Sequence, residues 1–197
     1  MRGRPKNFNP EEALNKAMDL FWDRGFEATS IQDLVDNVGI NRASMYDTFG
    51  DKRAFFCAAV EHYGKTVTES QLRTLEAAES PLEGVRQWFC SLAATATDGR
   101  LRGCLVTNTA IELAPHNENI GDAVRKALLH MEDSICNALI RAQDAGQMAD
   151  HADARALARF LIGSAQGIVV LSRAGADRET IADMLKVALS RIADRSQ

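Results

Sequence analysis

Residues 26–52, FEATSIQDLVDNVGINRASMYDTFGDK, decide the fold of the N-terminal part of the chain. Ser30 with Asp33 three residues later is the pattern of a helix N-terminus, because a serine side chain can cap the first backbone N–H groups. Gly39 ends this short helix, and Asn41 begins a second one. Two short helices joined by a glycine-containing turn predict a helix-turn-helix.

A longer helix precedes this pair and completes a three-helix unit. Asn9 is a helix cap, Pro10 fits the first helical position, and Glu12 stands where a capping box places its acidic residue. Gly25 can take the left-handed conformation that ends the helix. The apolar residues of this helix are Ala13, Leu14, Ala17, Met18 and Phe21.

The rest of the chain keeps the apolar spacing of amphipathic helices, and no period-2 strand pattern is found. The expected helices span residues 51–75, 80–97, 104–114, 120–145, 154–174 and 177–192. We therefore predict an all-α protein. A flexible basic arm at 1–8 precedes a three-helix helix-turn-helix domain at 9–53, and a larger helical domain follows at 54–197.

Composition limits the class of protein. Of the 197 residues, 46% are hydrophobic and 25% charged, which is ordinary for a globular chain. The net charge of −4 counts against a generally basic surface, so any DNA contact must come from local placement of cations. The cysteines are far apart and form no CxxC pair, which predicts reduced thiols rather than a zinc site or disulfide framework. They are Cys57, Cys90, Cys104 and Cys136.

Targeting signals and catalytic motifs are not found in the sequence. The longest apolar run, at 160–171, is interrupted by Ser164 and Gln166 and is shorter than the roughly 20 residues of a membrane span. No apolar stretch follows the basic N-terminus as in a secretory signal. We therefore expect a cytoplasmic protein with no membrane partner. Scattered histidines and the lack of a nucleophile-base pair predict no metal, no cofactor and no enzyme activity.

The second short helix has the polar side chains typical of a recognition helix, which enters the major groove of DNA. Arg42 can reach guanine or phosphate, and the hydroxyls of Ser44, Tyr46 and Thr48 can bond phosphate oxygens. Lys52 adds a phosphate contact from the start of the next helix. A merely solvated polar face is the alternative interpretation.

The basic arm is a second candidate for DNA contact. Its cations are Arg2, Arg4 and Lys6. Such an arm can enter a minor groove and add salt-dependent affinity, but it can equally be a disordered tail.

The segments FEATSI at 26–31 and VGINRASMYDTFGDK at 38–52 closely resemble the DNA-binding domain of the TetR family of transcriptional regulators. The resemblance covers about residues 8–56. It implies an all-helical homodimer that binds palindromic double-stranded DNA operators. It also implies, as is usual in the family, repression that a small-molecule effector relieves.

Matched position by position, the resemblance assigns roles within the helix-turn-helix. Phosphate contacts fall to Thr29, Tyr46 and Lys52, and base-edge positions to Arg42, Ala43 and Ser44. The chain departs from the family pattern at Asp47, where histidine is common, and at Thr48, where an aromatic residue is common. A carboxylate near phosphates is unfavourable unless it accepts from cytosine N4 or an arginine, so the base preference there stays open.

In the larger domain the resemblance implies dimerisation through the two C-terminal helices, here 154–174 and 177–192. Gly163, Ala165 and Gly167 would permit close helix approach; an ordinary buried helix of a monomer is the alternative. Ligand pockets are mostly apolar with a few polar groups. The candidate ligand residues, each also open to a simple packing role, are Trp88, Phe89, Cys104, Asn108, Glu112, Met131 and Gln166.

The segment RGCLVTNT at 102–109 resembles one branch of the family, in which some members sense electrophiles or oxidants through a cysteine that opens this helix. A cysteine at a helix N-terminus beside arginines is expected to be more reactive, and a buried structural thiol is the alternative. We therefore expect a ligand-responsive repressor, or alternatively a thiol-based repressor triggered at Cys104. The competing class is a helical enzyme or a non-DNA interaction module in which residues 30–50 serve as scaffold.

Overall fold

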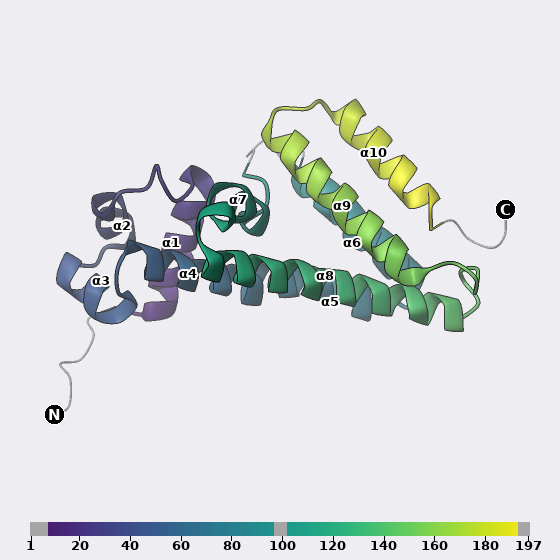
Figure 1. Cartoon of the computed structure of the whole chain (residues 1–197), viewed down its shortest axis with the longest axis horizontal. Coiled ribbons are helices and arrows are strands. Elements are labelled where there is room, and N and C mark those ends of the chain that lie inside the picture. The colour runs from purple at the N-terminus through teal and green to yellow at the C-terminus, as the bar shows by residue number, and fades with distance from the viewer. Residues whose placement is uncertain (1–7, 97–101, 193–197) are drawn as a thin grey trace.

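The computed structural model describes residues 8–96 and 102–192, which form helices and no strands (Figure 1). The α-helices are α1 (Pro10–Arg24), α2 (Ile31–Val38), α3 (Arg42–Phe49), α4 (Lys52–Tyr63), α5 (Glu69–Ala77), α6 (Pro81–Ala96), α7 (Leu105–Glu112), α8 (Glu118–Asp144), α9 (Ala154–Arg173) and α10 (Arg178–Ser190). The all-α prediction is confirmed. The predicted arm cations Arg2, Arg4 and Lys6 lie outside the described residues.

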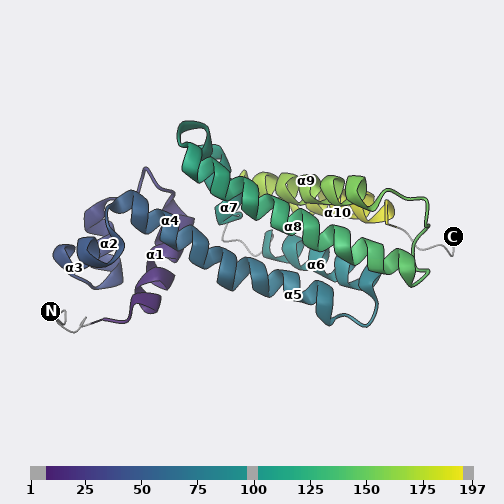
Figure 2. The ribbon, with the colours of Figure 1, turned by 60° about the horizontal axis from the view of Figure 1, so that its bottom comes forward.

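Helices α1, α2 and α3, the N-terminal unit, gather at one end of the molecule in both views (Figures 1 and 2). The capping box predicted for α2 is present: Asp33 N donates to Ser30 Oγ at 3.0 Å, and Ser30 N donates to Asp33 Oδ2 at 2.8 Å. Gly39 ends α2 in the left-handed conformation. Gly25 ends α1 as predicted and has a positive φ of 83°, but its ψ of 174° is extended and differs from that of a left-handed cap.

Aromatic rings fill the core of the N-terminal unit. Phe21 of α1 packs edge-on against Phe56 of α4, with ring centroids 4.9 Å apart, and Phe26 packs on the same ring at 5.1 Å. Phe55 is also fully buried. The domain boundary expected after residue 53 thus falls inside α4, whose side chains complete this core.

Helices α4 and α5 lie end to end and lead from the N-terminal unit along α8 (Figures 1 and 2). The sequence predicts one helix over 51–75, whereas a π-helical segment, Gly64–Thr68, separates α4 from α5. Thr66 Oγ1 donates to the carbonyl of His62 at 2.8 Å at this point. The wider turn keeps the two helices in one continuous rod.

Helices α5 to α10 form the larger helical domain. α5 and α8 run side by side, α6 and α9 cross them, and α10 lies against α9 on the outer side (Figures 1 and 2). By length and composition, α9 is the one helix of the described residues that could cross a membrane. Its buried face, which includes Leu161, Ala165 and Ile168, is typical of the core helix of a bundle.

The capping box of α2 predicts a pH-dependent contribution to stability. Hydrogen bonds from Ser30, followed by the charge of Arg24, hold the pKa of Asp33 below its ordinary value of 3.8. A carboxyl whose pKa is lower in the folded state stabilises the protein above its unfolded pKa and loses this effect as the pH falls through the folded value. The difference in Tm between wild type and Asp33→Asn should stay constant above about pH 5 and shrink below about pH 4. A difference that persists into acid would contradict this role.

Candidate nucleic-acid interface

Helix α3 presents a polar face to solvent because its apolar side is fixed in the core. Asn41 caps the helix by accepting from Ser44 N at 2.8 Å. Met45 is fully buried, and the Phe49 ring stacks on Phe55 with centroids 4.1 Å apart. The residues left exposed are Asn41, Arg42, Ala43, Tyr46 and Asp47, with Ser44 and Thr48 half-buried.

Two cations next to this face are held by neighbouring side chains. Arg42 Nη2 lies 3.5 Å from Gln32 Oε1, and Gln32 in turn donates to Asp36 at 2.8 Å. Lys52 Nζ lies 4.2 Å from the centroid of the Phe26 ring, a cation–π contact at the start of α4. The sequence did not single out Gln32, because a polar residue at an exposed helix position is common and does not by itself indicate a DNA contact.

Thr29 is placed differently from the expectation. Its side chain is fully buried, and its hydroxyl donates to the carbonyl of Gly25 at 2.7 Å. The expected phosphate contact of this side chain is therefore corrected: the hydroxyl stabilises the turn between α1 and α2.

The segment before α7 joins the larger domain to α1. Arg102 forms ion pairs with Asp19 at 2.8 Å and Asp23 at 2.6 Å, and its guanidinium carbon lies 4.3 Å from the centroid of the Trp22 ring. Trp22 Nε1 donates to the carbonyl of Gly103 at 2.9 Å. These contacts join residues about 80 positions apart, so no local pattern in the sequence indicates them.

The contacts of Arg102 and Gly103 with α1 form one joint between the two parts of the chain. Glu112, at the other end of α7, forms a second joint with the N-terminal unit. The carboxylate of Glu112 accepts the backbone N–H groups of Phe26 at 3.1 Å and Glu27 at 2.9 Å. A side-chain carbon on Gly25 would come within 3.0 Å of this carboxylate. Glu112, a candidate ligand residue, thus binds the loop after α1.

The remaining candidate ligand residues lie in the core or make contacts between elements. Trp88, Phe89 and Met131 are buried in the hydrophobic core. The hydroxyl of Thr107 donates to Gln166, and Asn108 donates to the carbonyl of Arg102 at 2.9 Å. A ligand-binding role for these positions stays a prediction, and two of the candidates, Asn108 and Glu112, line one cleft.

Cys104 lies at the start of α7, half-buried, and the hydroxyl of Tyr63 donates to its sulfur at 3.6 Å. Burial, with the neighbouring Cys104 thiol, raises the pKa of Tyr63 well above its ordinary value. The Tyr63 hydroxyl therefore stays protonated and acts as donor. Cys104 thus contacts α4 through Tyr63 and adjoins the Gly103 contact with α1.

An apolar cavity and a wider cleft border α7 in the described part of the chain. An apolar cavity of about 180 Å³ lies between α4, α7 and α8, with Phe56, Val60, Val106 and Val124 among its lining residues. Cys57 also lines it, and burial raises the pKa of this thiol. A wider cleft of about 470 Å³ lies between the end of α1, α7 and α9 and includes Asn108 and Glu112.

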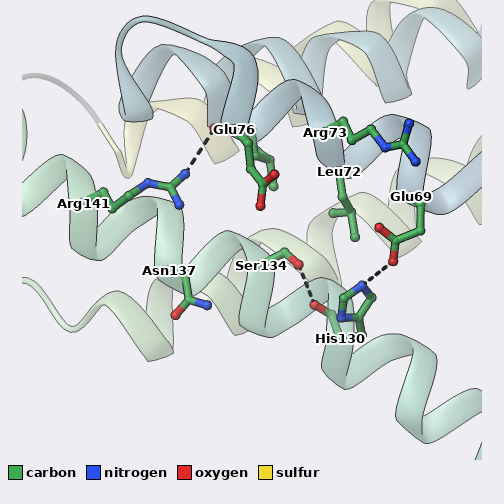
Figure 3. A pocket seen from close by; sticks show the side chains of 9 residues that line it. Glu69, Leu72, Arg73, Glu76, His130, Ser134, Asn137 and Arg141 are labelled. Carbon is green, nitrogen blue, oxygen red and sulfur yellow. Dashed lines mark hydrogen bonds and ion pairs between the residues drawn. The ribbon is translucent and has the colours of Figure 1, made fainter.

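A smaller polar groove of about 120 Å³ lies between α5 and α8 (Figure 3). His130 Nε2 lies 2.7 Å from Glu69 Oε1, and Arg141 donates to the carbonyl of Leu75 at 3.2 Å. Arg73 lies beside Glu69 on α5 in this view. Within residues 8–96 and 102–192, no group of three histidine, cysteine or acidic side chains is placed to hold a metal ion.

Comparison with known proteins adds independent findings. Residues 13–59 match the family model described as bacterial regulatory proteins, tetR family, and residues 81–188 match the model described as tetracyclin repressor-like, C-terminal domain. The chain is 34% identical over 190 residues to the uncharacterized HTH-type transcriptional regulator YezE of Bacillus subtilis, which covers 95% of this chain and 98% of YezE. It is 31% identical over 182 residues to the HTH-type transcriptional repressor ComR of Escherichia coli, with 91% and 87% covered.

A solved structure has the same fold and contains DNA. It is a cysteine mutant of the TetR family transcriptional regulator CifR complexed with 26-base-pair double-strand operator DNA. Its TM-score with this chain is 0.85 at 30% identity, with 95% of this chain and 98% of CifR covered. These matches span both parts of the chain, and the family they define consists of DNA-binding regulators rather than enzymes. The chain therefore belongs to the TetR family of transcriptional regulators.

Proposed function

We propose that this regulator is a cytoplasmic repressor that binds a palindromic operator as a homodimer and is released by a small molecule. The observation that carries the proposal is the exposed polar face of α3, fixed on a rigid aromatic core. The repressor ComR and the DNA-bound CifR, both similar over most of the chain, support it.

The contacts with DNA follow from the exposure of each side chain. Arg42, Ala43 and Ser44 lie at the start of α3 and would face base edges, because a recognition helix reads bases with its N-terminal residues. The hydroxyls of Tyr46 and Thr48 would bond phosphates. Lys52 and the arm cations Arg2, Arg4 and Lys6 would supply salt-dependent affinity that the acidic total charge does not.

Replacing both Arg42 and Tyr46 with alanine should weaken operator binding by about tenfold or more, because the base contact of an arginine alone is worth about 1–3 kcal/mol and the lost phosphate contact adds to it. Fluorescence anisotropy with a palindromic duplex from the DNA beside the gene measures the change. Arg73→Ala, an exposed arginine on α5, is the matched control and should bind like wild type. Unchanged affinity in the double variant, with folding intact, would refute the assigned surface.

Dimerisation is proposed through the outer faces of α9 and α10. Phe160 of α9 is 44% exposed and Val187 of α10 is 55% exposed, and both line one shallow hollow with Met184. A second copy covering this apolar surface would remove it from water. It would also provide the second recognition helix that a half-site spacing of roughly 34–36 Å requires.

Val187→Asp should convert the dimer to a monomer, because a lone carboxylate at the centre of an apolar interface is costly to bury. Size-exclusion chromatography with light scattering reports the mass, and operator affinity should fall with it. Leu129→Asp on α8, where the leucine is 54% exposed, is the control that should remain dimeric. A dimeric Val187→Asp variant would place the interface elsewhere.

The effector is proposed to occupy the apolar cavity between α4, α7 and α8. Its volume of about 180 Å³ suits a small apolar molecule, since a cavity of about 150 Å³ can bind benzene. Phe56 and Val60 line it from α4, the helix that also completes the core of the N-terminal unit. A ligand that prefers one position of α4 would therefore change operator affinity, typically by about 1–3 kcal/mol of coupling.

The thiol-triggered alternative is favoured by the contact between Tyr63 and Cys104. An adduct on this sulfur would displace the Tyr63 hydroxyl and press on the adjoining Gly103, which holds Trp22 of α1. Modification would thus act directly on the joint between the two parts of the chain.

N-ethylmaleimide distinguishes release by a reversible ligand from release by thiol modification, because a cysteine thiolate adds to its carbon–carbon double bond. If Cys104 is the trigger, treatment should weaken operator binding by about tenfold or more in a Cys57→Ser, Cys90→Ser variant and leave Cys104→Ser unaffected. Anisotropy before and after treatment measures this. Cys90 is exposed and Cys57 lines the apolar cavity, so their removal leaves Cys104 and the buried Cys136 as the remaining thiols. Operator binding that survives modification of Cys104 would leave the reversible ligand as the effector.

A further inference from the structure

We propose that the cleft between the N-terminal unit and the larger helical domain binds a small amphipathic carboxylate. The cleft, of about 470 Å³, is lined by Arg24 and Gly25 at the end of α1, Ile111 and Glu112 of α7, and Val170 and Arg173 of α9. Its walls therefore come from both parts of the chain. It differs from the apolar cavity proposed for the effector, which no arginine lines.

The apolar side chains of the cleft are exposed to water and favour a ligand with a hydrocarbon part. Ile111 is 64% exposed and Val170 is 41% exposed, although both lie in a concave site. A short alkyl chain or an aromatic ring lying on these two side chains would remove both from water, with a gain proportional to the apolar area covered.

The charged part of the cleft selects an anion. Arg24 uses Nη1 for the ion pair with Asp33 at 3.1 Å, and Arg173 uses Nη1 to donate to the carbonyl of Arg102 at 2.7 Å. Each guanidinium keeps further N–H donors, and bidentate binding of a carboxylate is their preferred use.

Glu112, the acidic residue that lines the cleft, does not reverse the preference for an anion. Both oxygens of Glu112 already accept backbone N–H groups, from Phe26 and Glu27. Asp33 is occupied by the capping box of α2 and by Arg24. The cleft thus contains two arginines and one carboxylate, Glu112, whose oxygens are already hydrogen-bonded. This charge distribution favours a ligand with an anionic end group over one with a cationic end group.

Isothermal titration calorimetry of the full chain with sodium octanoate tests the site, and no DNA is needed. We expect saturable binding, with octan-1-ol binding at least about tenfold more weakly because it lacks the charge-assisted bonds. Arg24→Gln and Arg173→Gln should each weaken octanoate binding by about tenfold. Arg73→Gln, at the polar groove of Figure 3, is the matched control and should bind like wild type.

Ile111→Ala provides a second test that removes no hydrogen bond, because the side chain is exposed and apolar. It should weaken octanoate and octan-1-ol equally, whereas the arginine variants should affect octanoate alone. Absence of saturable octanoate binding, equal affinity for acid and alcohol, or wild-type affinity in all three cleft variants would overturn the proposal. Because the titration contains no operator, these outcomes are independent of the proposed repressor function.

Discussion

Arg102 lies over the indole ring of Trp22 and pairs with the carboxylates of Asp19 and Asp23, and at the other end of α7 Glu112 holds the loop after α1. These two joints fix the position of the N-terminal unit relative to the larger helical domain. Among the described residues, α7 with its flanking residues and α4 both connect the larger helical domain to α1. The orientation of α3 in the molecule therefore depends on α7.

The ion pairs between α1 and Arg102 are partly exposed to solvent and individually weak. Asp19 and Asp23 have side chains 58% and 56% exposed, so each ion pair with Arg102 contributes at most about 1 kcal/mol. The aromatic core around Phe21 is fully buried by contrast and makes the N-terminal unit itself rigid. The ligand response proposed above requires a rigid DNA-binding unit whose contact with the larger helical domain can change. The apolar cavity, the Cys104 contact and the interdomain cleft all border this joint.

The net charge of −4 is reconciled with DNA binding by the local distribution of charge. Arg42 and Lys52 lie near the recognition face, whereas many carboxylates are already engaged elsewhere: Asp33 in a helix cap, Asp19 and Asp23 with Arg102, and Glu112 with backbone N–H groups. Asp47 remains exposed on α3. Its carboxylate would repel phosphate, so it is the position where operator preference should differ from relatives that lack it.

The sequence by itself determined the features that short-range contacts produce. Ser30 with Asp33 and Asn41 cap their helices as expected, because a cap and the N–H group it binds lie within three residues. The tertiary structure alone decided the burial of Thr29, the contact between Thr107 and Gln166, and the hydrogen bonds by which Glu112 holds the loop after α1. Those outcomes depend on which helix face meets which neighbour. That is set by packing between residues as much as 86 positions apart, for which helical periodicity carries no information.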